Sequence, residues 1–150
     1  MKYEIERKFI LGKIPKNLNC VSKELIRQGY LVVLDDGLEI RIRQKGKKYF
    51  QTIKIGSGLK RHEIEIEIEK FQFQKLWSVT KGKRIEKIRY VTKLNKNKVE
   101  IDVYKGNLSG LLVAEVEFKS VNESKRFVPP RWFGRELTGE LIFYNKHLAS

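Results

Sequence analysis

Polar and apolar residues alternate along the first segment, Met1 to Leu11, with the period of two that is typical of a β-strand. Glu4, Glu6 and Lys8 fall on one face of this predicted strand. The opposite face carries Tyr3, Ile5, Arg7 and Phe9. A half-buried strand normally turns its apolar face to the core and its charges to water. The pattern recurs along the chain, and its polar faces carry both signs of charge.

The alternation is plainest from Arg61 to Glu69, where Arg61 and four glutamates share one face. His62 and three isoleucines share the other, so we expect His62 to point outward. Turn sequences such as Asp35-Asp36-Gly37 separate further segments of the same kind. Strands are predicted over 30–34, 38–44, 48–55, 84–93, 98–104 and 112–118.

Helical spacing of apolar residues predicts three helices, over 17–28, over 71–81 and from 139 or 140 to 149. The first of them would end at Gly29. A short helical turn is predicted over 121–126. Eight strands, mostly joined by hairpins, and these helices predict an α+β fold with an eight-stranded antiparallel closed β-barrel. We expect one domain over residues 1–150, a length that suits a single core.

The chain is strongly basic, with 32 Lys and Arg against 18 Asp and Glu and a net charge of +14. An excess of this size indicates an anionic partner, such as nucleic acid, membrane phosphate or polyphosphate. Cys20 is the only cysteine, which excludes an internal disulfide and a cysteine-based metal site and fits a cytoplasmic protein. No signal peptide or membrane-spanning segment is predicted, so we expect no membrane partner.

The charged faces permit two arrangements. In the first, they face water and the apolar faces make the interior. In the second, the apolar faces pack outward beneath the helices, and the charged faces line a wet lumen. Helices with apolar faces need an apolar surface to cover, which favours the second arrangement. Buried charges are tolerated there only if opposite signs pair or a ligand fills the lumen.

Both signs are available for such a lumen. The carboxylates are Glu4, Glu6, Glu63, Glu65, Asp102, Glu115 and Glu117, and the cations are Lys8, Arg41, Arg43, Lys54, Lys87 and Arg89. Carboxylate oxygens suit Mg²⁺ or Mn²⁺, and Arg and Lys suit phosphate oxygens.

The segment Glu4-Ile5-Glu6-Arg7-Lys8 resembles the ExExK signature of the CYTH superfamily, the triphosphate tunnel metalloenzymes. The resemblance extends over essentially the whole chain in the family's order. It includes the segments 41–43, 52–54, 61–65, 87–90, 100–102, 114–118 and 138–149. It implies an eight-stranded tunnel that binds a triphosphate moiety together with divalent metal, Mg²⁺ or Mn²⁺.

The resemblance also implies roles for the lumen residues. Phosphate binding would fall to Arg41, Arg43, Lys54, Lys87 and Arg89, and metal binding to Glu4, Glu6, Glu115 and Glu117, with Glu63, Glu65 and Asp102 as further acidic candidates. Gln28-Gly29-Tyr30 resembles a segment of small bacterial members in which the tyrosine and the signature lysine act as a pair. Lys8 and Tyr30 are therefore the candidate catalytic residues, although Tyr30 also suits an ordinary strand position. A lysine surrounded by cations would have the lowered pKa of a base.

The function expected from the residues and the resemblance is a metal-dependent triphosphatase that cuts tripolyphosphate into pyrophosphate and phosphate. Alternatives within the superfamily are a class IV adenylate cyclase, a thiamine triphosphatase and a nucleoside triphosphatase. A non-catalytic polyphosphate-binding or RNA-binding module is a further alternative, but binding of polyanions alone requires no carboxylates. The expected partner is thus tripolyphosphate or another small triphosphate rather than nucleic acid, and a homodimer is compatible with the sequence.

Overall fold

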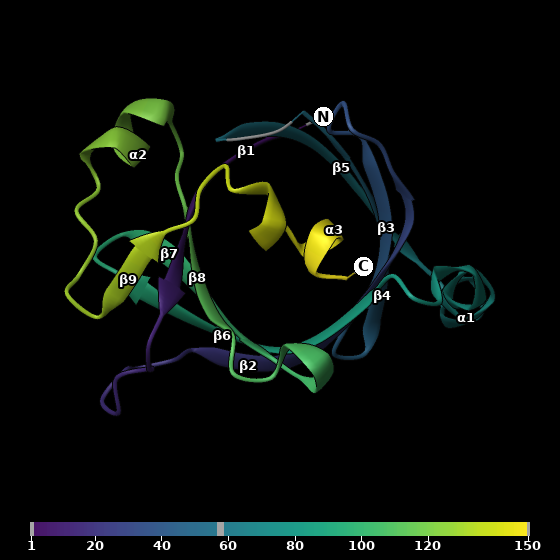
Figure 1. Ribbon diagram of the computed structural model, residues 1–150, viewed down its shortest axis with the longest axis horizontal. Coiled ribbons are helices and arrows are strands. Elements are labelled where there is room, and N and C mark those ends of the chain that lie inside the picture. The colour runs from purple at the N-terminus through teal and green to yellow at the C-terminus, as the bar shows by residue number, and fades with distance from the viewer. Residues whose placement is uncertain (1, 57–58, 150) are drawn as a thin grey trace.

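The computed structural model describes residues 2–56 and 59–149, in which one antiparallel sheet curls into a closed barrel (Figure 1). Its strands are β1 (Lys2–Leu11), β2 (Ser22–Val33), β3 (Glu39–Lys45), β4 (Lys48–Ile55), β5 (Lys60–Ile68), β6 (Arg84–Leu94), β7 (Asn97–Tyr104), β8 (Leu112–Glu117) and β9 (Phe133–Glu136). They pair in the order β5-β4-β3-β2-β6-β7-β8-β1, and pairing of β5 with β1 closes the ring. The predicted eight-stranded barrel is confirmed, and β9 adds to the later half of β1.

Short helices accompany the barrel. They are α1 (Lys70–Trp77), α2 (Val121–Arg126), α3 (Asn145–Leu148) and the 3₁₀ turns η1 (Ser78–Thr80), η2 (Gly106–Leu108) and η3 (Leu141–Phe143). The predictions over 71–81 and 121–126 are confirmed by α1 with η1 and by α2. None of the described helices is long and apolar enough to cross a bilayer.

The apolar faces of β1, β7 and β8 point away from the lumen, as the inverted arrangement requires. Together with Phe118 after β8 and Phe133 of β9, they form a core cluster that contains Ile5, Phe9, Leu11, Val99, Ile101, Ala114 and Val116. The cover comes from Ile14 and Leu18 in the irregular segment after β1, from Leu94 at the end of β6, and from Phe127 and Trp132 between α2 and β9. Burial of this surface outside the sheet leaves the inner faces free for charge.

A second core cluster lies at one end of the barrel. Tyr30, Ile85, Tyr104 and Val113 come from the end of β2, the start of β6, the end of β7 and the start of β8. Leu137 and Ala149 from the C-terminal segment pack against them. Figure 1 shows α3 and the C-terminus inside the ring of strands, so this segment fills part of the barrel.

Two predicted helices differ in the structure. Residues 17–21 are irregular and 22–28 belong to β2, because this segment pairs along its length with β6 and, from Ile26 onward, with β3. The apolar spacing did not mark a helix face, since Val21 and Leu25 are exposed. Cys20, which lies within the segment of this predicted helix, is exposed as well. The terminal helix is split into η3 and the four-residue α3.

Gly29 shows why β2 needs a glycine beside Tyr30. A Cβ atom at this position would lie 2.6 Å from the side chain of Thr80, which is fully buried in η1. The absence of a side chain therefore lets η1 pack directly on the outer surface of β2.

Arg7 holds α2 and β9 against the outer face of β1. Its Nη1 donates to the carbonyls of Ser124 (2.7 Å) and Phe127 (3.0 Å), and its Nε and Nη2 donate to the Glu136 carboxylate at 2.9 and 2.8 Å. The guanidinium also lies 5.3 Å from the centre of the Phe9 ring. One cation thus satisfies acceptors from two separate segments, the one around α2 and the strand β9.

We expect Arg7→Met to lower the free energy of unfolding by about 2 kcal/mol, because it leaves two carbonyls and a carboxylate without their charged donor. Urea unfolding would measure this loss. The matched control is Arg135→Met, which removes an exposed arginine paired with Glu140 and should change stability by less than about 0.5 kcal/mol. Equal effects of the two substitutions would contradict this role of Arg7.

Candidate functional site

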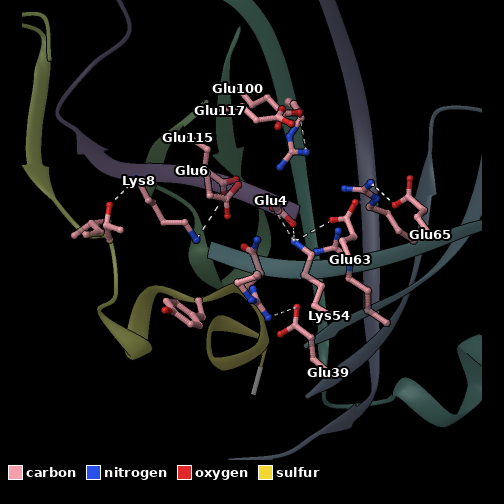
Figure 2. A pocket seen from close by; sticks show the side chains of 18 of the residues that line it. Glu4, Glu6, Lys8, Glu39, Lys54, Glu63, Glu65, Glu100, Glu115 and Glu117 are labelled. Carbon is pink, nitrogen blue, oxygen red and sulfur yellow. Dashed lines mark hydrogen bonds and ion pairs between the residues drawn. The ribbon is translucent and has the colours of Figure 1, made fainter. Parts of the chain in front are cut away.

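The barrel encloses a cavity of about 200 Å³ with an almost entirely charged wall (Figure 2). Eight carboxylates line it: Glu4, Glu6, Glu39, Glu63, Glu65, Glu100, Glu115 and Glu117. Eight cations line it too: Lys8, Arg41, Arg43, Lys45, Lys54, Arg61, Arg89 and Lys98. Tyr30, Leu137, Thr138, Gly139, Tyr144 and Asn145 complete the wall. The strand alternation brings these charges together because each strand contributes its inward face.

Lys54 joins two of the predicted acidic residues. Its Nζ lies 2.9 Å from Glu4 Oε2 and 3.6 Å from Glu63 Oε2, and Glu63 is its direct cross-strand neighbour. Burial alone would raise the pKa of Glu4, but Lys54 and hydrogen bonds from Glu63 and Glu6 leave that pKa lowered. Glu4 is therefore the ionised centre of this group.

Glu6 is the carboxyl group least able to ionise. Burial raises its pKa well above the ordinary value of 4.5, and the neighbouring charges of Glu115 and Glu4 raise it further. The pKa of Glu63 is raised as well, by burial and by its hydrogen bond to Glu4. The raised pKa values of Glu6 and Glu63 thus come from crowded, buried carboxylates, an environment that a divalent cation would relieve.

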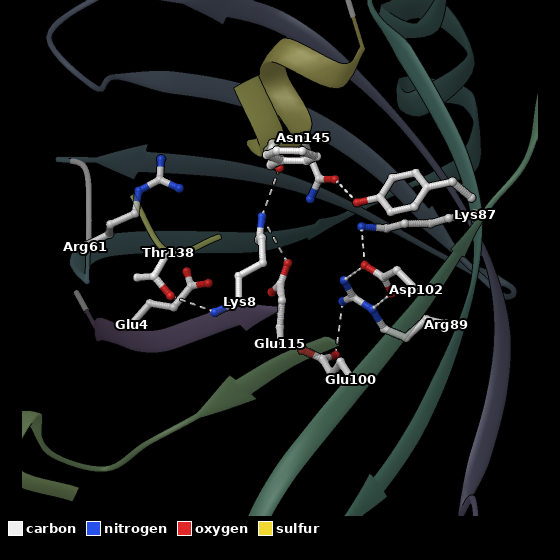
Figure 3. A network of polar contacts seen from close by, with 12 residues as sticks. Glu4, Lys8, Arg61, Lys87, Arg89, Glu100, Asp102, Glu115, Thr138 and Asn145 are labelled. Carbon is white, nitrogen blue, oxygen red and sulfur yellow. Dashed lines mark hydrogen bonds and ion pairs between the residues drawn. The ribbon is translucent and has the colours of Figure 1, made fainter. Parts of the chain in front are cut away.

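Lys8 belongs to β1, and its side chain points toward the C-terminal segment (Figure 3). Its Nζ lies 3.4 Å from Glu115 Oε1, donates to the carbonyl of Phe143 at 3.3 Å and lies 5.7 Å from the centre of the Tyr144 ring. Burial raises the pKa of Glu115, but Lys8 and Arg89 leave it lowered. The expectation that cations surround Lys8 is wrong, because its immediate contacts are a carboxylate, a carbonyl and a ring.

Tyr30 faces the same cavity and is 1% exposed. Its hydroxyl accepts a hydrogen bond from Gln28 Nε2 at 2.9 Å. Burial and the Glu39 carboxylate raise the pKa of Tyr30, so the phenol is neutral at physiological pH. Lys8 and Tyr30 thus line the same cavity, but each of them contacts a different set of residues.

Two arginines from β3 carry buried donors that face no acceptor. Arg41 Nε and Arg43 Nε are buried and have no hydrogen-bond partner within the described part of the chain. Arg43 pairs through Nη2 with Glu65 at 3.1 Å. Burial, together with repulsion from Arg41 and Arg89, lowers the pKa of Arg43 to about 10. An anion at this position would satisfy both orphaned donors.

Arg89 and Lys87 are anchored by Asp102 (Figure 3). Arg89 donates to both carboxylate oxygens of Asp102, at 2.7 and 2.8 Å, and also pairs with Glu100 at 3.0 Å. Lys87 Nζ lies 2.8 Å from Asp102 Oδ2, and both residues of this pair are fully buried. Arg89 lines the cavity, whereas Lys87 and Asp102 lie behind its wall.

Sequence reasoning passed over several lining residues. Arg61 and Glu39, which lie 3.5 Å apart, share the inward faces of their strands with predicted site residues, so alternation contained the signal. Tyr144 and Asn145 reach the cavity only because the C-terminal segment enters the barrel, and the local pattern contains no sign of this. Tyr104 and Asn145 are joined by a hydrogen bond between their side chains.

The carboxylates determine which metal the site would suit. Within residues 2–56 and 59–149, no three Asp, Glu, His or Cys side chains converge as a preformed metal site. Glu4, Glu6, Glu63 and Glu115 nevertheless form a run of mutual contacts. Their all-oxygen donor set suits a hard cation such as Mg²⁺ or Mn²⁺.

Known proteins resemble this chain over nearly its whole length. The CYTH domain profile matches residues 2–140. An inorganic triphosphatase of Nitrosomonas europaea is 46% identical over 148 residues, which cover 97% of this chain and 96% of the relative. An inorganic triphosphatase of Acetivibrio thermocellus is 34% identical over 152 residues, with 99% and 94% covered. The crystal structure of an inorganic triphosphatase matches with a TM-score of 0.74 at 43% identity, and covers 99% of this chain and 95% of its own.

The raised pKa of Glu6 predicts a pH-dependent stability in the absence of divalent cations. Above the ordinary value of 4.5 the folded chain keeps a proton that the unfolded chain has lost, so the contribution of Glu6 falls as pH rises through the raised pKa. We expect the melting temperature of the wild type minus that of Glu6→Gln to decrease between about pH 5 and pH 8. Glu86→Gln, which removes an exposed carboxylate, should show a constant difference. A difference for Glu6→Gln that rises with pH would contradict the prediction.

Proposed function

The chain belongs to the CYTH domain family, and we propose that it is a metal-dependent inorganic triphosphatase that cuts tripolyphosphate into pyrophosphate and phosphate. Two relatives that it matches over almost their full length are inorganic triphosphatases. The observation that carries the proposal is the pair of orphaned, buried arginine donors, Arg41 Nε and Arg43 Nε, in a lumen lined by charge.

The cations in the wall of the cavity are suited to bind phosphate oxygens. Arg41, Arg43, Lys54 and Arg89 line the cavity and would bind them. Lys87 would act indirectly, because it pairs with Asp102, which in turn holds Arg89 in place. Catalysis of phosphoryl transfer depends mainly on positioning and on neutralising charge on the transferred group, and a lumen of fixed cations supplies both.

The acidic residues would hold the metal. Glu4, Glu6, Glu63 and Glu115 are the best placed, since they contact one another, while Glu117 also lines the cavity. Glu65 and Asp102 are already engaged by arginines. A bound Mg²⁺ or Mn²⁺ would neutralise negative charge on the phosphate groups. Its charge would lower the raised pKa values of Glu6 and Glu63 and so favour their ionised forms.

The cavity volume favours a small inorganic substrate over a nucleotide. At about 200 Å³ it lies below the roughly 300–1,000 Å³ that is typical of sites for drug-sized ligands. Its wall is charged, and its aromatic side chains, Tyr30 and Tyr144, are both buried. The nucleoside of ATP would therefore have to stay outside, and its ribose would not be held in line for cyclisation.

With Mg²⁺ or Mn²⁺, we expect faster hydrolysis of tripolyphosphate than of ATP and no formation of cyclic AMP. Phosphorus NMR would follow orthophosphate and pyrophosphate in the first reaction. Arg41→Met, which removes a phosphate-binding donor, should lower turnover at least about 100-fold while the protein stays folded. Cyclic AMP and pyrophosphate from ATP, with tripolyphosphate left intact, would instead identify a cyclase.

Lys8 and Tyr30 are proposed to position the attacking water from two sides of the cavity. Tyr30→Phe removes only a hydroxyl, so we expect kcat to fall about 100-fold with little change in KM. Tyr49→Phe is the matched control, because Tyr49 packs on Phe73 outside the cavity and should retain wild-type kinetics. A wild-type rate in Tyr30→Phe would remove Tyr30 from the mechanism.

A further inference from the structure

The lumen does not account for the basic excess of this chain. Its wall holds eight cations and eight carboxylates, and the buried pair of Lys87 and Asp102 adds one of each sign. This set has no net charge, so the whole excess of +14 comes from residues outside it. A substrate bound in the tunnel therefore leaves most of the positive charge without a partner.

The excess of positive charge outside the lumen is concentrated in three segments. Residues 12–23, 93–96 and 119–132 contain nine Lys and Arg and one acidic residue, Glu123. We call the nine the basic face: Lys13, Lys16, Lys23, Lys93, Lys96, Lys119, Lys125, Arg126 and Arg131. All nine are exposed, and none takes part in an ion pair between described residues.

The three segments cover a single side of the barrel. Leu18 from the first, Leu94 from the second and Phe127 from the third all pack on the core cluster outside β1, β7 and β8. Figure 1 shows α2 and β9 beside β7 and β8, on the side of the barrel opposite α1. The nine cations therefore lie on one side of the barrel, where Glu123 is the one acidic residue of these segments, and are not scattered over the molecule.

Aromatic side chains lie among these cations. Tyr90 and Trp132 are half-buried at the rim of the same core cluster. Lys23 Nζ lies 5.8 Å from the centre of the Tyr90 ring, and Trp132 packs edge-on against Phe133. Cations that follow a phosphate backbone, interleaved with rings on which bases stack, are the combination used to bind single-stranded nucleic acid.

We propose that the basic face binds single-stranded nucleic acid, independently of the tunnel. The clustered carboxylates that disfavour binding of nucleic acid lie in the lumen, whereas this face has one, Glu123. A lipid surface fits less well, because exposed aliphatic side chains here are few, Val21 and Val128, and α2 has only six residues.

The test uses a fluorescent single-stranded oligonucleotide of about 20 nucleotides with a 5′-hydroxyl end, which presents no triphosphate to the tunnel. The test variant combines Lys93→Gln, Lys96→Gln, Lys125→Gln and Arg126→Gln. The matched control removes the same charge near α1, through Lys47→Gln, Lys48→Gln, Lys70→Gln and Lys75→Gln. At about 50 mM salt, anisotropy should show a loss of affinity of at least about tenfold for the test variant only, with a salt slope smaller by about 3.

Two further measurements separate this site from the tunnel and from plain charge attraction. Saturating tripolyphosphate should leave oligonucleotide binding unchanged. In a Trp77→Phe background, the emission of Trp132 should be quenched by the oligonucleotide but not by inorganic polyphosphate of equal charge. Equal losses in the two four-site variants, displacement by tripolyphosphate, tighter binding of polyphosphate, or binding only to vesicles with anionic lipid would each overturn the proposal. None of these outcomes depends on whether tripolyphosphate is hydrolysed.

Discussion

Eight carboxylates and eight cations face one another across a cavity of about 200 Å³, and the rest of the structure depends on their mutual compensation. An unpaired ion in such a space costs several kcal/mol, so each charge needs an opposite partner, a hydrogen bond or a ligand. Arg89 with Asp102 provides such a partner between neighbouring strands, and Lys54 with Glu4 and Arg43 with Glu65 do so across one intervening strand. Where compensation is incomplete, the pKa of a carboxyl group is raised, as in Glu6, or a buried donor is left without an acceptor, as in Arg41.

A charged interior moves the hydrophobic core to the outside of the sheet. The strands β1, β7 and β8 must then be covered by segments that are not strands of the ring, and α2, β9 and the irregular residues after β1 perform this task. Arg7 connects them to the barrel through the carbonyls of α2 and the Glu136 carboxylate. The same covering segments present the basic face to solvent, so the location of the excess charge follows from the inverted arrangement.

The C-terminal segment has a corresponding role inside the ring. Leu137 and Ala149 pack with Tyr30 and Tyr104, which gives the lumen one apolar end. The carbonyl of Phe143 meanwhile accepts a hydrogen bond from Lys8. The position of the candidate catalytic lysine is therefore determined jointly by the first strand and by the last residues of the chain.

The sequence by itself determined which side chains share a face of each strand, because a strand assigns alternate residues to opposite faces. The period of two placed Glu4, Glu6 and Lys8 on one side of β1, and the same rule holds for Arg41, Arg43 and Lys54. The resemblance of residues 4–8 to the ExExK signature identified the family, and the match to the CYTH domain profile confirms it. Only the tertiary structure decided that residues 22–28 extend β2, since pairing with β3 and β6 outweighed their local helical spacing. It also placed Lys87 behind the wall and brought Asn145 into it, because both positions depend on contacts between segments far apart in the chain.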